Sequence, residues 1–414
     1  MPGGLLRVVT AGSVDDGKST LVGRLLHDAK AVLADQLTAV QDASLRRGYV
    51  GADLALLVDG LRAEREQGIT IDVAYRYFAT GRRTFILADT PGHVQYTRNT
   101  VTGASTADVA VILVDARSGV VEQTRRHLAV TSLLRVSEIV LAVNKMDLVD
   151  FSETVFDSIV ADFAGAADKL EVDHFTPIPV AALSGDNIVE PSAQMPWYSG
   201  MPLLEFLEAV APAANAELPA RFPVQVVIRP RTAEYPDYRG YAGRIESGML
   251  RKGDRVRVLP SGQLSAVEGI DTADGELAEA TVGRSVTVRL TDDLDISRGD
   301  LIVADAAPLP VTSRELAATV CWLTDAPLRV GNRYRLRHTT RDVRAAVEAV
   351  ESRLDVASMD HIPADELNLN DIGAIRLRLA EQVATDPYLL NRSTGSFLLV
   401  DEPSGITVAA GLIR

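Results

Sequence analysis

Residues 7–26 read RVVTAGSVDDGKSTLVGRLL, and this stretch decides the fold. RVVTA is a short apolar run typical of a buried strand, and the segment from Ser19 to Lys30 has helical spacing. The loop between them fits the pattern G-x-x-x-x-G-K-[ST]. Its residues are Gly12, Ser13, Val14, Asp15, Asp16, Gly17, Lys18 and Ser19, followed by Thr20. A strand, this loop and a helix together predict a P-loop that binds nucleoside triphosphates.

Each residue type in this loop has a physical reason to be there. Glycines let consecutive backbone N–H groups turn inward around phosphates, and the helix N-terminus favours an anion. We expect Lys18 to reach the β- and γ-phosphates and the Ser19 hydroxyl to bind Mg²⁺.

Four more apolar runs follow, at residues 84–89, 109–115, 138–144 and 177–181, with helical segments such as 123–135 between them. Apolar strands that alternate with helices predict an α/β domain, in which a mostly parallel sheet carries helices on both faces. Ligands of such sheets bind at the carboxyl ends of the strands, and the other chemical motifs lie at those ends.

Two of these strands end in motifs that read the nucleotide. Asn144, Lys145 and Asp147 form N-K-x-D, in which the carboxylate can accept from guanine N1–H and the exocyclic amine together. This motif therefore predicts GTP as the nucleotide. DTPGH ends the strand at 84–89: we expect Asp89 to hold Mg²⁺ through water, Gly92 to contact the γ-phosphate, and His93 to orient the attacking water.

Two further segments complete the predicted site. Thr70, in REQGIT, can give its hydroxyl to Mg²⁺ and its N–H to the γ-phosphate, which would order that loop only while GTP is bound. Ala181, Ala182 and Leu183 occupy the last guanine-contact loop, where Ser-Ala-Leu is usual. The first position lacks the hydroxyl, but the Ala182 N–H can still contact guanine O6.

The pattern of apolar and turn-forming residues changes after a linker at 215–220, NAELPA. Alternating strands and turns at 223–230, 241–260, 285–290 and 295–304 predict a small β-barrel, and a second β-rich segment begins near residue 315. We therefore expect three domains: a GTP-binding domain at 1–217 and barrels at 218–310 and 311–414.

Composition limits the class of ligand and the cellular location that we expect for the protein. A net charge of −14 argues against a dominant grip on nucleic acid, and the sequence has neither a membrane-spanning run nor a secretory signal. Cys321 is the only cysteine, which excludes an intrachain disulfide and leaves a thiolate metal site unsupported. These features indicate a cytoplasmic protein. A locally basic stretch, Arg329–Arg344, fits either a solvated face with mixed partners or a docking patch for an acidic surface.

The motifs, in this order, resemble the translational GTPases typified by elongation factor Tu. VDDGKSTLVGRLLHD (14–28), DTPGHVQYTRNTVTGAST (89–106) and residues 126–153 resemble more closely the GTPase (large) subunit of bacterial sulfate adenylyltransferase. Val94 departs from the Glu that is frequent there. The resemblance implies that GTP hydrolysis drives the synthesis of adenosine 5′-phosphosulfate by a smaller catalytic subunit, which binds ATP and sulfate. No second P-loop motif follows, so adenylylsulfate kinase activity is not expected of these residues.

Two rival hypotheses share every GTP motif. The first is a translational GTPase that binds tRNA, supported by the basic stretch and opposed by VDDGKST, QYTRN and the acidic balance. The second is a stand-alone regulatory GTPase, whose hydrolysis would not depend on ATP and sulfate.

Overall fold

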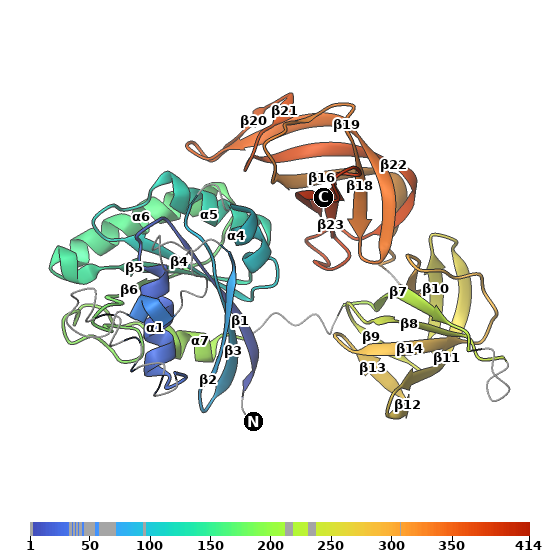
Figure 1. The fold of residues 1–414 in the computed structure, drawn as a ribbon, viewed down its shortest axis with the longest axis horizontal. Helices are drawn as coiled ribbons and strands as arrows, with labels where there is room; N and C mark the ends of the chain where they lie inside the picture. Colours follow the sequence, from blue (N-terminus) through green and yellow to red (C-terminus); the bar gives the residue numbers. More distant parts are fainter. Residues whose placement is uncertain are drawn as a thin grey trace. The chain divides into compact units, whose positions relative to one another are not determined.

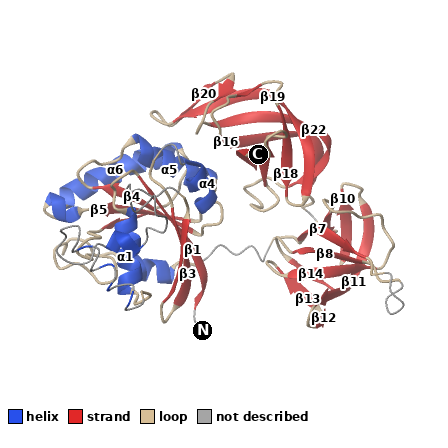
Figure 2. Cartoon of the chain, in the orientation of Figure 1, coloured by secondary structure: helices blue, strands red, loops and turns tan. Residues whose placement is uncertain are grey.

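The computed structural model describes residues 3–32, 35, 38, 40, 44, 54–57, 72–93, 97–211, 218–230, 237–306 and 308–414. The chain forms two compact units, Met1–Ala213 with Asp355–Asp360 and Ala214–Leu354 with His361–Arg414. All of the described helices belong to the first unit, and the second is built from strands (Figure 2). The division into three domains at 217/218 and 310/311 remains our proposal.

The first unit is a sheet with helices on both faces (Figure 1). Its elements are β1 (Gly3–Gly12), α1 (Lys18–Asp28), η1 (Leu54–Leu57), β2 (Ala74–Ala79), β3 (Arg83–Asp89), α4 (Thr97–Ala104), β4 (Val109–Asp115), α5 (Glu122–Leu133), β5 (Glu138–Asn144), η3 (Met146–Val149), α6 (Glu153–Lys169), β6 (Thr176–Pro179) and α7 (Leu203–Ala209). The strand order is β2-β3-β1-β4-β5-β6, in which only β2 runs antiparallel to its neighbour. The α/β fold expected from the sequence is confirmed, with β2 as an added edge strand.

Burial explains why this sheet forms. Every residue of β4, VAVILVD, is buried, as expected for a central strand covered by helices on both sides. Leu21 and Leu25 of α1 and Leu203 and Leu207 of α7 pack in one apolar core with Val111 of β4 and other strand residues. The same arrangement brings the carboxyl ends of β1, β3, β4 and β5 to one edge of the sheet.

The second unit holds two closed barrels. The first uses β7 (Arg221–Ile228), β8 (Gly240–Arg244), β10 (Arg255–Leu259), β11 (Gln263–Thr272), β12 (Gly275–Leu277), β14 (Ser285–Leu290) and β15 (Leu301–Ala304), with β9 (Met249–Arg251) paired to β13 (Glu279–Thr281). The second uses β16 (Val311–Trp322), β18 (Arg333–His338), β19 (Arg341–Asp355), β20 (Asp360–Pro363), β22 (Ile372–Thr385), β23 (Ser396–Val400) and β24 (Thr407–Ile413), with β17 (Leu328–Arg329) paired to β21 (Glu366–Leu367). Pairings β10–β11 and β18–β19 close the two sheets.

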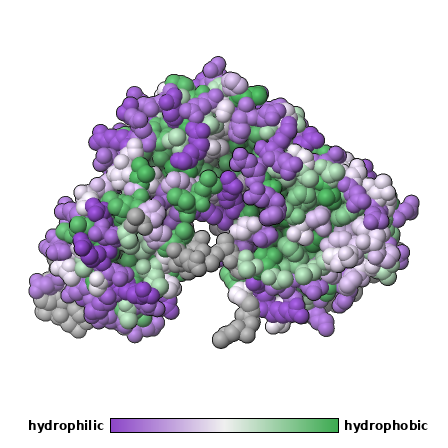
Figure 3. Space-filling view, turned by 180° about the vertical axis from the view of Figure 1, so that it is seen from behind, coloured by the Kyte–Doolittle hydropathy of each residue, from purple (hydrophilic) through white to green (hydrophobic). Residues whose placement is uncertain are grey.

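Buried and exposed residues alternate along the barrel strands, as expected when one face of each strand packs in the core. In β18, RYRLRH, every second residue is buried and the arginines between them are exposed. The face of the chain drawn in Figure 3 accordingly mixes hydrophilic side chains with smaller apolar areas. Among the described helices, none is long and apolar enough to cross a membrane.

Candidate GTP-binding site

The P-loop joins the end of β1 to the start of α1, as the sequence predicts. Its backbone turns through positive φ at Gly12 (155°), Asp15 (66°) and Gly17 (91°). Gly17 also has no room for a side chain, because a Cβ there would collide with the Asn144 amide nitrogen. Glycine at this position thus allows both the left-handed turn and the close approach of a second motif.

Lys18 is folded back onto its own loop. Its Nζ donates to the carbonyl oxygens of Gly12 at 2.9 Å and Ser13 at 2.7 Å, and only 7% of the residue is exposed. Burial lowers the pKa of Lys18, while the nearby Asp89 and Asp16 oppose that shift. The ammonium group is therefore held at the loop that we expect to surround the phosphates.

Asp16 shapes the same loop from inside. One of its carboxylate oxygens accepts from the Ser13 N–H at 2.5 Å, and burial raises the pKa of this carboxyl. Its backbone carbonyl accepts from Asn144 Nδ2 at 2.7 Å. The second Asp of VDDGKS is thus a structural clamp on the P-loop, a role that the motif alone does not reveal.

The two predicted magnesium ligands in the described part of the chain lie side by side. Ser19 Oγ is 3.3 Å from Asp89 Oδ2, and Thr10 Oγ1 donates to Asp89 Oδ1 at 2.8 Å. Asp89 is fully buried, so its carboxylate is oriented by these hydroxyls rather than by solvent. A hydroxyl and a carboxylate oxygen next to a phosphate loop suit Mg²⁺, which uses few protein ligands and completes its shell with phosphate and water.

DTPGH lies directly against the P-loop. A Cβ on Gly92 would come within 2.5 Å of Lys18 Nζ and 2.9 Å of the Gly12 carbonyl oxygen, so only glycine fits there. His93 is half-buried immediately after it. The predicted γ-phosphate contact is therefore next to the P-loop lysine, and the predicted water-orienting histidine follows it in the chain.

The base-recognition motif is tied to the P-loop through the side chains of Asn144 and Lys145. Lys145 Nζ donates to the Asp15 carbonyl and lies 2.9 Å from Asp115 Oδ2. Arg117 binds the same carboxylate through two nitrogens, at 3.0 and 2.6 Å. Burial raises the pKa of Asp115, but hydrogen bonds from Arg117 and Lys145 outweigh it and hold that pKa well below its usual range. Asp115 and Arg117 were not among the residues predicted from the sequence.

The last guanine-contact loop adjoins this motif. The Ala182 N–H, which we expected to contact guanine O6, donates to Asn144 Oδ1 at 3.0 Å. Arg24 of α1 donates to the carbonyl oxygens of Ala182, at 3.1 Å, and Leu183. Ala181 pairs with Asp186, and Asp147 is half-buried beside the loop. The three segments are brought together as predicted, while each contact to guanine stays a prediction.

Sequence reasoning missed a buried histidine below the P-loop. His127 of α5 is 1% exposed, with Nε2 at 3.1 Å from the Gly12 carbonyl oxygen and 3.2 Å from Gln123 Nε2. Burial, with a smaller effect of Lys18, lowers the pKa of His127 to about 3, so the ring is neutral at physiological pH. Its sequence signal was the i, i+4 pair of polar residues on the apolar face of a helix.

Several predicted features lie outside the described residues. These are Thr70 with the rest of REQGIT, Val94, and Gln95 and Tyr96 of the QYTRN segment.

The basic stretch of the second unit is mostly neutralised. Within the described part of the chain, each of its arginines except Arg333 forms an ion pair: Arg329 with Glu366, Arg335 and Arg337 with Asp342, Arg341 with Asp300 and Glu381, and Arg344 with Glu402. This pairing supports a solvated face with mixed partners and weakens the case for RNA binding.

Comparison with known protein families agrees with this geometry. Residues 4–214 match the family model for the elongation factor Tu GTP binding domain, and residues 315–414 match the GTP-eEF1A C-terminal domain-like model. The first unit is therefore a GTP-binding domain of the elongation factor Tu class, and the chain binds GTP.

Two named relatives show which family of GTP-binding proteins the chain belongs to. Sulfate adenylyltransferase subunit 1 of Aeromonas hydrophila is 52% identical over 99% of this chain and 86% of its own length. The bifunctional enzyme CysN/CysC of Mycobacterium tuberculosis is 53% identical over 99% of this chain and 67% of its own. The chain belongs to the sulfate adenylyltransferase subunit 1 family. Among solved structures, sup35 complexed with GMPPNP aligns over 99% of this chain and 94% of its own, with 24% identity and a TM-score of 0.43.

Proposed function

We propose that this chain is the GTP-hydrolysing subunit of a sulfate adenylyltransferase, acting in the cytoplasm. A smaller partner subunit would bind ATP and sulfate and transfer the adenylyl group, giving adenosine 5′-phosphosulfate and pyrophosphate. Sulfate is a poor nucleophile and pyrophosphate readily reverses the reaction, so the step needs an energy source. Cleavage of GTP on this chain would supply it.

The family assignment supports the coupling role, and one structural observation supports GTP as the nucleotide: the phosphate-binding and base-recognition motifs form one connected structure. Asn144 Nδ2 and Lys145 Nζ both donate to carbonyl oxygens of the P-loop, so the two ends of a bound nucleotide would meet a single rigid frame. GTP and GDP would share the guanine contacts of Asp147 and Ala182. They would differ at Lys18 and Gly92, which we expect to contact the γ-phosphate.

Hydrolysis would rest on positioning and charge. Lys18 would exchange its two carbonyl partners for phosphate oxygens, and P-loop N–H groups would hold the remaining charge. Ser19, Asp89 and Thr70 would hold Mg²⁺, which when bound neutralises charge on the β- and γ-phosphates. His93 would orient the water that attacks the γ-phosphorus while the bond to the bridging β–γ oxygen breaks.

The direct test is phosphate release from GTP by the purified chain, with and without the small subunit, ATP and sulfate. We expect release to rise only when all three are present, together with accumulation of adenosine 5′-phosphosulfate. GTP hydrolysis that ignores ATP and sulfate would retain the GTPase and reject the coupling.

A His93→Ala variant sharpens this test. We expect the side chain to act on water and not on the nucleotide, so GTP affinity should stay within about twofold while hydrolysis slows by about 10²-fold. Product formation should slow with it in the coupled assay. A loss of GTP binding instead would make His93 a structural residue.

A further inference from the structure

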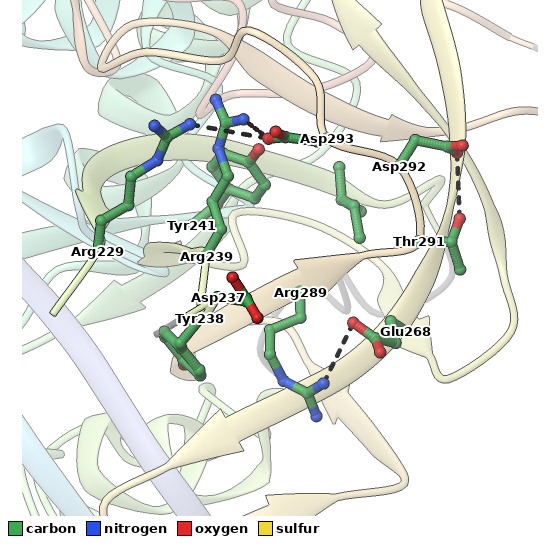
Figure 4. A pocket seen from close by; sticks show the side chains of 11 residues that line it. Arg229, Asp237, Tyr238, Arg239, Tyr241, Glu268, Arg289, Thr291, Asp292 and Asp293 are labelled. Carbon is green, nitrogen blue, oxygen red and sulfur yellow. Dashed lines mark hydrogen bonds and ion pairs between the residues drawn. The ribbon is translucent and has the colours of Figure 1, made fainter. Parts of the chain in front are cut away.

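A cavity of about 580 Å³ opens in the first barrel of the second unit, and none of the residues that line it is assigned to GTP. Arg229 follows β7, Arg239 precedes β8, and Arg289 belongs to β14 (Figure 4). Tyr238 and Tyr241 contribute aromatic surface to the same cavity. Three arginines and four carboxylates line the cavity, and one of these carboxylates pairs with both Arg229 and Arg239.

That group is the side chain of Asp293. It pairs with Arg239 and lies 3.8 Å from Arg229, as the dashed lines in Figure 4 show. The Asp293 side chain is 84% exposed, whereas that of Arg239 is 16% exposed. A poorly solvated arginine is thus balanced by a carboxylate that remains almost fully in water.

Arg239 is otherwise fixed in place. Its guanidinium carbon lies 5.6 Å from the centroid of the Tyr241 ring, and the Tyr241 hydroxyl donates to the Leu294 carbonyl at 3.1 Å. Its Nε is buried and has no hydrogen-bond partner within the described ranges. Arg239 is therefore preorganised, and together with Arg229 it places two positive charges against the single carboxylate of Asp293.

Arg289 provides the contrast within the same cavity. Its guanidinium is surrounded by Asp271 at 2.9 Å, Glu268 at 3.3 Å and Glu276 at 3.4 Å, and Tyr238 also donates to Asp271. Arg289 is therefore already paired with carboxylates of the same barrel. The part of the cavity that can accept another carboxylate is the pair Arg229 and Arg239, which pairs with Asp293.

We propose that this pair receives an acidic side chain of the catalytic partner subunit and that Asp293 is an internal placeholder, which the incoming carboxylate displaces. Because exposed ion pairs are weak, exchanging one carboxylate for another costs little, while the incoming group would also remain shielded by its own protein. This inference rests on the proposed function, since it assigns a docking point for the partner.

The surrounding charges select a protein carboxylate over a phosphate. Asp237, Glu268 and Asp292 also line the cavity and would repel a multiply charged anion or an RNA backbone more strongly than a single carboxylate. The planar guanidinium fork matches a single carboxylate, as Asp293 itself demonstrates.

Two variants should move the affinity for the purified catalytic subunit in opposite directions. In calorimetry at fixed ionic strength, Asp293→Asn should tighten the complex by about threefold, because the competitor is removed. Arg239→Gln should weaken it by about tenfold or more, because the incoming carboxylate loses its partner. Arg251→Gln is the matched control: Arg251 lies on the same barrel, pairs with Glu279, and has a 58% exposed side chain. It should leave the affinity unchanged.

The outcomes separate the two proposals. A complex that is indifferent to both variants, or weakened by Asp293→Asn, would overturn the placeholder and leave the coupling function standing. No complex with the unmodified chain would overturn both. GTP affinity serves as the folding check, and every variant should retain it, because the cavity contains no residue of the GTP site.

Discussion

In the first unit the buried charges Lys18, Asp89 and Asp115 come from short motifs that end three strands of one sheet. In the second unit the buried pair Arg221–Asp386 joins β7 to the turn after β22, 165 residues further along the chain. The first set surrounds a place for a ligand, whereas the second connects two barrels. Burial of charge thus has a functional use in one unit and an architectural use in the other.

The partners of these groups show the difference. Asp386 accepts from Arg221 Nε at 2.9 Å and Nη2 at 3.0 Å, and from Thr394 Oγ1 at 2.5 Å. Arg221 Nη2 also donates to the Pro308 carbonyl at 2.8 Å. The ionic groups of this pair are saturated within the unit. Among the described residues, by contrast, Lys18 donates to the Gly12 and Ser13 carbonyl oxygens, and we propose that it exchanges these for phosphate.

The largest expected effect is that of Lys18→Ala. Removing the ammonium group should abolish turnover and lower GTP affinity by about 10²-fold or more, because charge on the β- and γ-phosphates loses its closest counterion. Equilibrium binding of a fluorescent GTP analogue and single-turnover hydrolysis measure the two effects. The barrels should remain folded. Undiminished hydrolysis would end the P-loop assignment.

Arg221→Met should do the reverse, leaving GTP affinity intact and destabilising the second unit. An unpaired Asp386 in a buried position costs about 3–5 kcal/mol. The chain has two tryptophans, Trp197 in the first unit and Trp322 in the second. Urea unfolding followed in a Trp197→Phe background therefore reports the second unit alone. The double variant Arg221→Met/Asp386→Leu should recover much of the loss, and an equal loss in both would contradict this account.

Asp147→Asn probes the guanine end of the site. Without the carboxylate that accepts from N1–H and the exocyclic amine, GTP affinity should fall roughly tenfold to a hundredfold, and xanthosine nucleotides should be preferred. Competition between GTP and xanthosine triphosphate measures the switch. Unchanged GTP affinity would remove Asp147 from base recognition.

The sequence predicted the parts of the site that are local and missed those that depend on distant packing. P-loop, DTPGH and N-K-x-D each place their residues within one strand end, so the parallel sheet was sufficient to predict that they would meet. The contact of His127 with the Gly12 carbonyl spans 115 residues and depends on how α5 packs against β1. The edge strand β2 was missed because its apolar pattern is short: only Phe78 of AYRYFA is buried. Arg221 and Asp386 carry no local signal of their pairing.

The smallest expected effect at neutral pH is that of the two buried histidines. The pKa of His127 falls from 6.5 to about 3 through burial, and burial likewise lowers the pKa of His338, whose Nε2 lies 2.7 Å from the Thr394 carbonyl oxygen. Between pH 6.5 and 3 the unfolded chain binds a proton that folded His127 does not. Stability is therefore full above pH 6.5 and falls below it, by up to about 1.4 kcal/mol per pH unit for each histidine.

His127→Gln should remove that slope from the first unit alone, and His338→Gln from the second alone. Urea unfolding between pH 6.5 and 4.5, read through Trp197 or Trp322 in single-tryptophan backgrounds, separates the two units. Only His127→Gln should also weaken GTP binding, because only His127 contacts the P-loop carbonyl that Lys18 shares. Equal effects of both variants on GTP affinity would mean that the units do not use their buried groups differently.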